Sequence, residues 1–444
     1  MRTSSVLHRG RRAAGVVALA LLLAGFGSTP ASAGSTRDKQ WFLDAMQAEA
    51  MWQTSTGKGI TVAVIDTGVD PDKPDLQGRV LDGRDFAPPS RSGDEHTDYN
   101  GHGTGMAGLI AGTGSYEGGN GAFGLAPGAH ILPVRMPDAD DVSPFAVPAY
   151  FVKAIRYAAD AGARVINISM TGGANSPDLA EAVTYALSKG ALVFAAAGND
   201  AEQGAHIAYP AATPGVVGVA AVGKDLRRTA ASQHGPQVDM AAPGEDLVHA
   251  CGGRTGLCET SGTSDATALA SASAALIWSV HPDWTNNQVL RVMLNTLGAP
   301  TDGAKRNDSI GYGIVRPRIA LTDPGDPGPA DVYPLPDLKA AASASPSAAA
   351  GGSAPTRDAD AAPTAGAAGK EGTALPWSAL GIGTAGLLLG ALTVLLVVAR
   401  RRKAAVPPHR AALSGQIPPA PPGFGPPPGT AGQFGPPEHG SGSS

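Results

Sequence analysis

Cysteines, basic blocks and internal repeats are scarce or missing in this sequence. Two cysteines among 444 residues are too few for a disulfide-dense small domain or for a structural zinc site with four ligands. The formal net charge is −5 and the body holds no dense lysine or arginine block, which argues against nucleic acid as a partner. Without a repeat of solenoid length, one large domain with accessory segments is the simplest organisation for this chain.

Residues 1–33 have the pattern of a secretory signal peptide. Arginines near the start precede an apolar run from Ala13 to Gly25, and Ala31-Ser32-Ala33 supplies the small residues that a signal peptidase reads. The apolar run is shorter than the roughly 20 residues of a membrane-spanning helix, so we expect cleavage after Ala33 rather than an uncleaved anchor. Export would place the chain in an oxidising compartment, where Cys251 and Cys258 are predicted to form one small disulfide.

A second apolar segment, near the C-terminal end, is long enough to cross a membrane. Residues 380–399 supply about 20 mostly apolar positions, or roughly 30 Å as a helix, and no charged residue occurs in 372–399. Basic residues fill positions 400–403 directly afterwards. By the positive-inside rule they place residues 400–444 in the cytoplasm and the body outside. We therefore predict a single transmembrane helix at 377–399, in the cell membrane.

Two further segments lack the large apolar residues that a folded core needs. Residues 323–376 are rich in proline, alanine and serine, and residues 400–444 are richer still in proline. Such compositions cannot offset the entropy cost of ordering the chain. We predict a disordered stalk over 323–376 and an extended, disordered cytoplasmic tail over 400–444. Residues 34–322 then remain as one folded domain.

Within this domain, short β-rich runs alternate with helical patterns, which predicts an α/β fold with a parallel sheet flanked by helices. The predicted strands cover residues 60–65, 164–169, 191–197 and 216–222. One helix is predicted to begin at Ser176-Pro177 and to end at Lys189-Gly190, and Thr285 with Gln288 makes a capping box for another. Residues 34–59 are too few for a separate pro-domain, and their apolar positions predict a short N-terminal helix packed on the body.

Three polar residues framed by glycine stand at the edges of predicted elements. Asp66 ends an apolar strand, His102 lies in a Gly-His-Gly sequence, and Ser264 opens an alanine-rich helix after Gly262. Asp66 begins an Asp-Thr-Gly sequence, but an aspartic protease needs two carboxylates and no second Asp-Thr-Gly or Asp-Ser-Gly occurs. Each residue alone has a simple structural explanation. Their coincidence, in the order Asp, His, Ser, indicates a catalytic triad.

This order and the sequences around it resemble the subtilisin-like proteases from about residue 41 to 321. An α/β-hydrolase would instead need Gly-x-Ser-x-Gly and the order Ser, Asp, His. The resemblance implies that Ser264 is the nucleophile, His102 its general base and then acid, and Asp66 the group that orients the imidazole. Asn199, in an Ala-Ala-Gly-Asn-Asp sequence, is similar to the oxyanion-hole asparagine of that family. A serine endopeptidase that cuts protein or peptide substrates and needs no cofactor for catalysis is therefore expected.

Two departures from the family pattern bear on substrate choice and on pH dependence. The residues expected to bind substrate, on the strand that lines the first specificity pocket, are Ser169, Met170, Thr171 and Gly172. Relatives commonly have glycine sooner after the serine, so Thr171 is expected to narrow substrate choice. Asp265 replaces the methionine that usually follows the nucleophile, and a carboxylate there could raise the pKa of His102. The sequence leaves the pH range of activity open.

The succession of signal peptide, single catalytic domain, proline-containing stalk, membrane span and short tail resembles the mycosins, subtilisin-like proteases associated with type VII secretion machinery. This resemblance implies the membrane and components of a type VII membrane complex as partners. A scaffold that retains protease motifs while stabilising such a complex is the alternative function. Structural calcium is also left open, because Asp70, Asp72 and Asp75 follow Asp66 closely and many subtilisin-like relatives bind calcium.

Overall fold

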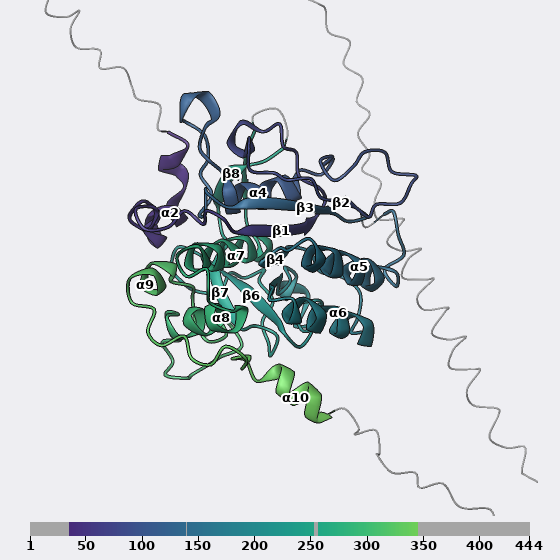
Figure 1. Ribbon diagram of the computed structural model, residues 1–444, viewed down its shortest axis with the longest axis vertical. Helices are drawn as coiled ribbons and strands as arrows, with labels where there is room; N and C mark the ends of the chain where they lie inside the picture. Colours follow the sequence, from purple (N-terminus) through teal and green to yellow (C-terminus); the bar gives the residue numbers. More distant parts are fainter. Residues whose placement is uncertain (1–34, 139, 253–255, 345–444) are drawn as a thin grey trace, which may run out of the picture. The chain divides into compact units, whose positions relative to one another are not determined.

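The computed structural model describes residues 35–138, 140–252 and 256–344 (Figure 1). No helix in these ranges is long and apolar enough to cross a membrane. The predicted signal peptide, the predicted transmembrane helix at 377–399 and the predicted cytoplasmic tail lie outside the described residues.

A parallel sheet of seven strands forms the centre of the domain, in the order β2-β3-β1-β4-β5-β6-β7 (Figure 1). The strands are β1 (Thr61–Asp66), β2 (Arg84–Asp85), β3 (His130–Arg135), β4 (Val165–Ile168), β5 (Leu192–Ala196), β6 (Val216–Val222) and β7 (Met240–Pro243). β1, β4, β5 and β6 confirm the four predicted strands to within one residue at each end. Their runs are apolar without interruption because helices cover both faces of the sheet.

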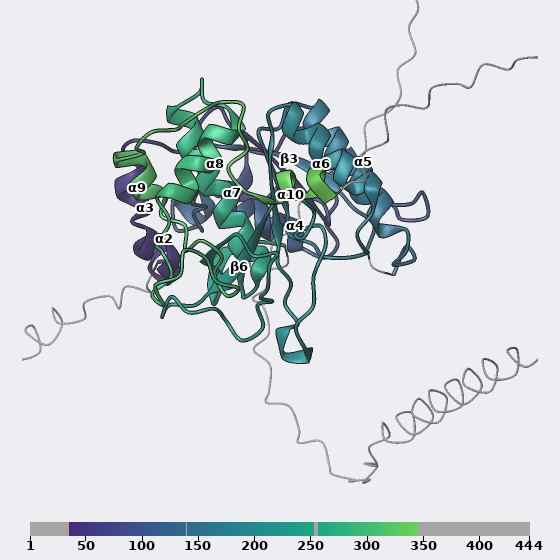
Figure 2. The ribbon, with the colours of Figure 1, turned by 90° about the horizontal axis from the view of Figure 1, so that it is seen from below.

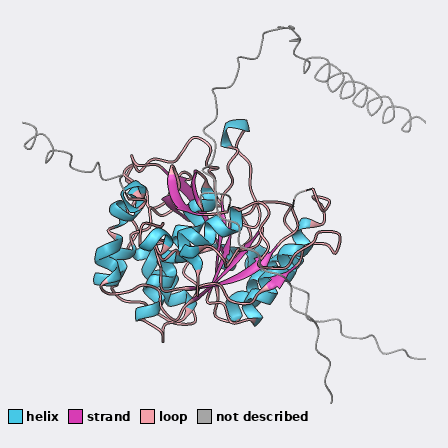
Figure 3. Cartoon of the chain, turned by 90° about the horizontal axis from the view of Figure 1, so that it is seen from above, coloured by secondary structure: helices cyan, strands magenta, loops and turns pink. Residues whose placement is uncertain are grey.

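Alternate strand residues face two apolar cores on opposite sides of the sheet. Val62 and Val64 of β1 belong to one core, whereas Ala63 and Ile65 belong to the other. Helices α4, α7, α8 and α9 cover the first core and α5 and α6 the second, so the domain has three layers (Figures 2 and 3). The helices are α4 (His102–Ala111), α5 (Val147–Asp160), α6 (Pro177–Ser188), α7 (Thr263–Val280), α8 (Asn286–Asn295) and α9 (Pro317–Thr322), with short 3₁₀ turns η1 (Arg37–Lys39), η2 (Pro74–Leu76), η3 (Tyr116–Gly118) and η4 (Ala201–Gln203).

Local sequence signals set several helix ends as predicted. The Ser176 hydroxyl accepts a hydrogen bond from the Leu179 amide at the start of α6, and Thr285 with Gln288 forms the capping box of α8. The N-terminal segment differs from the expected single helix. It forms two short helices, α2 (Trp41–Met46) and α3 (Ala48–Trp52), because Gln47 between them adopts a left-handed backbone conformation with φ of 57°.

Helix α7 runs through the first core and has almost no polar surface. Its residues from Thr263 to Trp278 are all buried. Most of them are alanine or serine, whose small side chains let the sheet and α4 approach closely. The buried Ser271 hydroxyl donates to the side-chain oxygen of Asn167 on β4 at 3.0 Å. This contact ties the middle of α7 to β4.

Just before α7, the chain forms an antiparallel hairpin of β8 (Leu247–Ala250) and β9 (Leu257–Thr260). The structure joins Cys251 and Cys258 by a disulfide across this hairpin, with the two Cα atoms 5.8 Å apart. The predicted pairing is therefore the one in the structure. It closes the hairpin next to the segment that leads to Ser264.

Replacing both cysteines with serine is expected to lower the free energy of unfolding by roughly 2.5 kcal/mol, because the disulfide removes loop-closure entropy from the unfolded chain. Chemical denaturation of the wild type and of the Cys251→Ser/Cys258→Ser variant measures this difference. Alkylation of the unreduced wild type provides the control, and free thiols there would show that the bond does not form in the purified protein.

The segment that follows α9 corrects the expectation of a stalk that is disordered from residue 323. Residues 323–344 lie against the domain and include helix α10 (Asp337–Ala344). Arg291 on α8 donates to the backbone carbonyls of Pro327 and Pro329, and the Leu335 side chain is buried. The amino-acid composition of the segment does not reveal these contacts. Two or three buried apolar residues and a few hydrogen-bonded proline carbonyls are enough to hold an irregular segment against the domain.

Asp239, just before β7, is expected to make stability depend on pH. Burial raises the pKa of Asp239 to about 8, partly offset by a hydrogen bond from the Gly218 amide and reinforced by the charge of Asp337. Its folded-state pKa lies above the unfolded value, so its favourable contribution is complete below about pH 4 and is lost as pH rises through about 8. Asp239→Asn should reduce this loss in denaturation curves across that range. Asp331→Asn removes one carboxylate at an exposed position and is the matched control.

Candidate active site

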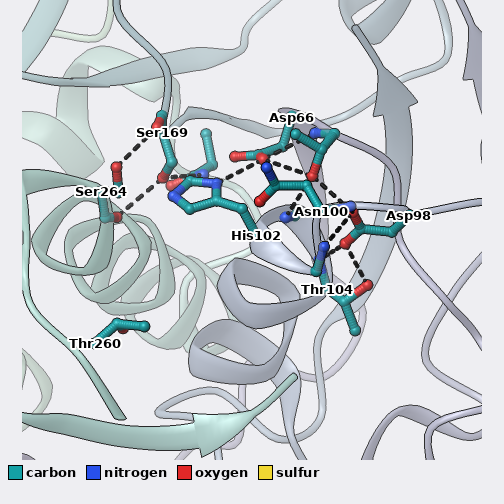
Figure 4. Close-up of polar contacts among 12 residues, drawn as sticks. Asp66, Asp98, Asn100, His102, Thr104, Ser169, Thr260 and Ser264 are labelled. Carbon is teal, nitrogen blue, oxygen red and sulfur yellow. Dashed lines mark hydrogen bonds and ion pairs between the residues drawn. The ribbon is translucent and has the colours of Figure 1, made fainter. Parts of the chain in front are cut away.

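Asp66 and His102 meet at the carboxyl edge of the sheet. Asp66 is the last residue of β1 and is fully buried, and its Oδ1 lies 2.7 Å from Nδ1 of His102, the first residue of α4 (Figure 4). The Thr67 amide also donates to Asp66 Oδ1 at 2.8 Å. A Cβ atom at Gly103 would lie 2.1 Å from the Gly68 carbonyl oxygen. The glycine after His102 therefore allows α4 to approach the end of β1 closely enough for this contact.

A second carboxylate, Asp98, fixes the start of α4. Asp98 Oδ2 accepts hydrogen bonds from the Thr104 amide at 2.8 Å and from the Thr104 hydroxyl at 2.6 Å, while Oδ1 accepts from the Gly101 amide at 2.7 Å. The Thr67 hydroxyl donates to the same Oδ1 at 2.8 Å (Figure 4). Asp98 thus links the turn after β1 to the helix that carries His102. Sequence analysis missed this residue, although an Asp a few residues before a helix start is a capping signal.

The electrostatics of this pair favour a protonated imidazole. The negative charge of Asp66 is the largest cause that raises the pKa of His102 to about 9, and burial acts in the opposite direction. The hydrogen bond to Asp66 and the charges of Asp265 and Asp98 add to the rise. The part contributed by Asp265 exists only while that side chain is ionised.

Ser264 lies in the first turn of α7 and bonds reciprocally with Ser169, just beyond β4. The Ser264 hydroxyl donates to the Ser169 carbonyl at 2.8 Å, and the Ser169 hydroxyl donates to the Ser264 carbonyl at 2.9 Å. In Figure 4 the His102 ring lies between Asp66 and this serine pair. The described residues thus show the Ser264 hydroxyl bonded to a backbone carbonyl rather than to His102. Such hydrogen bonds often tighten only when substrate is present, and a rotation about χ1 redirects a hydroxyl.

Asn199 follows β5 and faces the same turn. Its Oδ1 accepts from the Thr263 amide at 2.8 Å and from the Thr263 hydroxyl at 2.9 Å. An amide N–H only donates, so these bonds assign the oxygen and leave Nδ2 as the outward-facing donor. A Cβ atom at Gly262 would lie 3.1 Å from Nδ2. The glycine before Thr263 therefore keeps space in front of that donor.

The four residues predicted to bind substrate take different positions. Met170 and Thr171 line a cavity of about 80 Å³ together with Val147, Tyr150 and Phe151. Ser169 is bonded to Ser264, as described above, and the Gly172 amide donates to the Tyr209 carbonyl at 3.0 Å. Of the four residues, two thus line a mainly apolar cavity whose wall also includes Asp138.

The acidic residues considered for calcium do not converge. The carboxylate of Asp75 accepts from the amides of Tyr116 and Ala122 at 2.8 and 2.9 Å, and Asp70 pairs with Lys73 at 3.2 Å. Within residues 35–138, 140–252 and 256–344, no group of three or more His, Cys, Asp or Glu side chains is arranged to hold a metal. The described Asp70 and Asp75 side chains are thus engaged by protein groups.

Asp66, His102 and Ser264 lie at the carboxyl edge of the parallel sheet, and the family match identifies the chain as a subtilisin-like serine endopeptidase. Residues 57–313 match the subtilase family (peptidase S8), and the chain belongs to that family. Its sequence aligns with that of an intracellular serine protease of Paenibacillus polymyxa over 239 residues with 36% identity. The alignment covers 53% of this chain and 71% of that protein. The chain is also 36% identical over 239 residues to subtilisin E of Bacillus subtilis, covering 53% of this chain and 60% of that protein.

Solved structures of two mycosins are similar to the domain. The MycP3 protease from the type VII (ESX-3) secretion system matches with a TM-score of 0.56 and 32% identity, covering 64% of this chain and 88% of that one. MycP1 from Mycobacterium smegmatis matches with a TM-score of 0.59 and 28% identity, covering 68% and 89%. The chain is thus a subtilisin-like protease related to the mycosins.

Proposed function

We propose that this chain hydrolyses peptide bonds with Ser264 as nucleophile, His102 as general base and Asp66 as the residue that orients the imidazole. The 2.7 Å contact between Asp66 Oδ1 and His102 Nδ1 carries the proposal. It keeps a proton on Nδ1, so that Nε2 is the nitrogen free to accept the Ser264 proton. In this proposal Ser264 turns its hydroxyl from the Ser169 carbonyl toward His102 when substrate binds.

The proposed reaction follows from these positions. Ser264 Oγ attacks the scissile carbonyl carbon while His102 takes its proton, and Asp66 stabilises the resulting imidazolium. The carbonyl oxygen gains negative charge and accepts hydrogen bonds from Asn199 Nδ2 and from the Ser264 amide. His102 then protonates the leaving amine, and water repeats the sequence in reverse to release the acyl group.

Fluorophosphonate labelling tests this assignment directly, because the probe reacts only with an activated serine. The wild type should be labelled at Ser264, and the Ser264→Ala variant should not be labelled. An unlabelled wild type that is folded and intact would favour the scaffold function over the protease.

The pH profile of this enzyme is expected to have a displaced acidic limb. Only neutral His102 accepts a proton, and its pKa is raised to about 9, mainly by Asp66. The specificity constant kcat/KM should therefore fall as pH drops below about 9, well above the usual imidazole value of 6.5. The Asp66–His102 pair adds stability that is complete below pH 6.5 and is lost as pH rises through about 9. Peptide hydrolysis between pH 5 and 10 measures the limb, and a midpoint at or below 6.5 would contradict the assigned environment.

The membrane setting is a further part of the proposal. The signal sequence at 1–33, the apolar segment at 377–399 and the basic residues at 400–403 support a single-pass protein with its catalytic domain outside and residues 400–444 in the cytoplasm. The similarity to MycP3 from a type VII secretion system supports a role beside such a membrane complex. Fractionation of cells carrying the full chain with a C-terminal tag tests this topology. Added protease should remove the domain and spare the tag in intact cells.

A further inference from the structure

A second polar cluster lies against the first turn of α7. It joins His249 of β8, Thr260 of β9 and Asp265 of α7, and both His249 and Asp265 are almost completely buried. His249 Nε2 lies 2.8 Å from the Thr260 hydroxyl oxygen, which lies 2.6 Å from Asp265 Oδ1. His249 Nδ1 lies 2.9 Å from the Ala250 carbonyl oxygen. The proposed triad uses none of these contacts.

The fold makes room for the imidazole of this cluster. A Cβ atom at Gly105 on α4 would lie 2.7 Å from His249 Cε1, so only glycine fits opposite the ring. The His249 ring, on the hairpin that precedes α7, therefore packs against α4, which begins with His102. Thr260, at the end of β9, lies near the start of the helix that carries Ser264 (Figure 4).

The hydrogen bonds of this cluster limit where its protons can lie. A carbonyl oxygen only accepts, so Nδ1 of His249 carries a proton. The Thr260 hydroxyl has one proton to give. If it donates to Asp265, then Nε2 of His249 must donate to Thr260 and the imidazole is charged. If it donates to His249 instead, Asp265 must donate to Thr260 and is protonated.

Both arrangements contain the same number of protons and have no net charge. They differ only in the positions of two protons, which can exchange through the threonine hydroxyl. If the cluster lost a proton, the Thr260 hydroxyl could donate a hydrogen bond to only one of its two neighbours, His249 or Asp265. In the other contact, two lone pairs would face each other in a buried site. The observed distances therefore favour a cluster that retains its proton.

We propose that His249, Thr260 and Asp265 form a proton-sharing relay that keeps the Asp265 carboxylate electrically compensated beside His102. The inference rests on the proposed function, because its effect is exerted on the general base. His249 and Thr260 are thus positioning residues that act through Asp265. Without them, the residue after the nucleophile would present a bare negative charge to the imidazole.

The surrounding groups agree with this role. Outside the cluster, His102 from α4 is the charged group that acts on both His249 and Asp265, and Asp66 and Asp98 act in turn on His102, whereas Glu259 on β9 is exposed. Burial lowers the pKa of His249 and raises the pKa of Asp265, and these are the largest causes for each group. Both pKa shifts favour the arrangement in which the His249 imidazole and the Asp265 carboxyl group are each uncharged, with the proton on Asp265.

An Asp265→Asn variant separates the relay from a free carboxylate. An asparagine amide can donate to Thr260 as the protonated acid does, so the net charge of the cluster stays zero. We expect the acidic limb of kcat/KM to move by less than about 0.3 pH units. Removing a free carboxylate would instead move the limb down by about one unit, as a nearby charge commonly does, and that result would overturn the relay.

Imidazole nitrogen and carboxyl carbon NMR in the Ser264→Ala protein tests the relay without any need for activity. Between pH 5 and 9 neither His249 nor Asp265 should titrate. Thr260→Ser, which keeps the hydroxyl, should also be flat, whereas Thr260→Val should let one of the two groups titrate. Independent titration of His249 in the parent, or a flat response in Thr260→Val, would overturn the proposal. An inactive wild type with the expected NMR result would remove the triad assignment but not the relay.

Discussion

Alanine in place of Ser264 is expected to lower kcat by a factor on the order of 10⁶, the loss that the nucleophile causes in subtilisin, a relative of this chain. The hydroxyl is the only group in the proposed site that forms the acyl intermediate. His102→Ala should cause a loss of similar size, because the hydroxyl then has no base. Initial rates with a peptide substrate measure both effects.

The double variant distinguishes a triad from two independent residues. Groups that act as one unit give non-additive losses, so Ser264→Ala/His102→Ala should be scarcely slower than either single variant. Additive losses would refute the assignment. Near-UV circular dichroism is the control for folding, since Ser264 also bonds to Ser169 through its hydroxyl.

Asn199→Ala is expected to lower kcat by about 10² to 10³ with little change in KM, because the donor meets negative charge that develops only in the transition state. The structure adds a complication, since the Asn199 oxygen also accepts two hydrogen bonds from Thr263. Alanine removes both the donor and this anchor.

Asn199→Asp separates the two roles. Aspartate keeps an oxygen for Thr263 and loses the outward donor, so its kcat should fall at least as far as that of the alanine variant. A variant with aspartate that retained most of its rate would show that Asn199 acts only by anchoring Thr263. A change confined to KM in either variant would exclude the oxyanion role.

The sequence predicted the elements whose signals are local. Strands buried on both faces appear as unbroken apolar runs, and the helix caps at Ser176 and Thr285 need only side chains three residues apart. β3 contains Pro133 and β2 has only two residues, so neither carried a usable pattern. The left-handed conformation of Gln47 that divides the N-terminal helix also has no clear sequence signal.

In the candidate site, too, residues with a local sequence signal can be predicted and residues without one cannot. Glycine-framed sequences indicate Asp66, His102 and Ser264 as the candidate triad, because a close backbone approach at such residues leaves a pattern in the sequence. His249 and Thr260 are separated in sequence from the residues they serve, and an isolated histidine in a strand has no pattern of its own. Asp265 stands out in the sequence only as an unusual neighbour of Ser264. Its partners come together only in the folded hairpin beside α4.

The burial of α7 also has a consequence for the order of events during folding. A helix without a polar face is poorly stable in water on its own, so α7 forms as it docks against β4–β7 and α4. Ser264, in its first turn, reaches Asp66 and His102 only at that moment. Hydrolytic competence should therefore appear together with the completed domain. A chain that is still emerging or partly folded has no assembled site with which to cut itself or its neighbours.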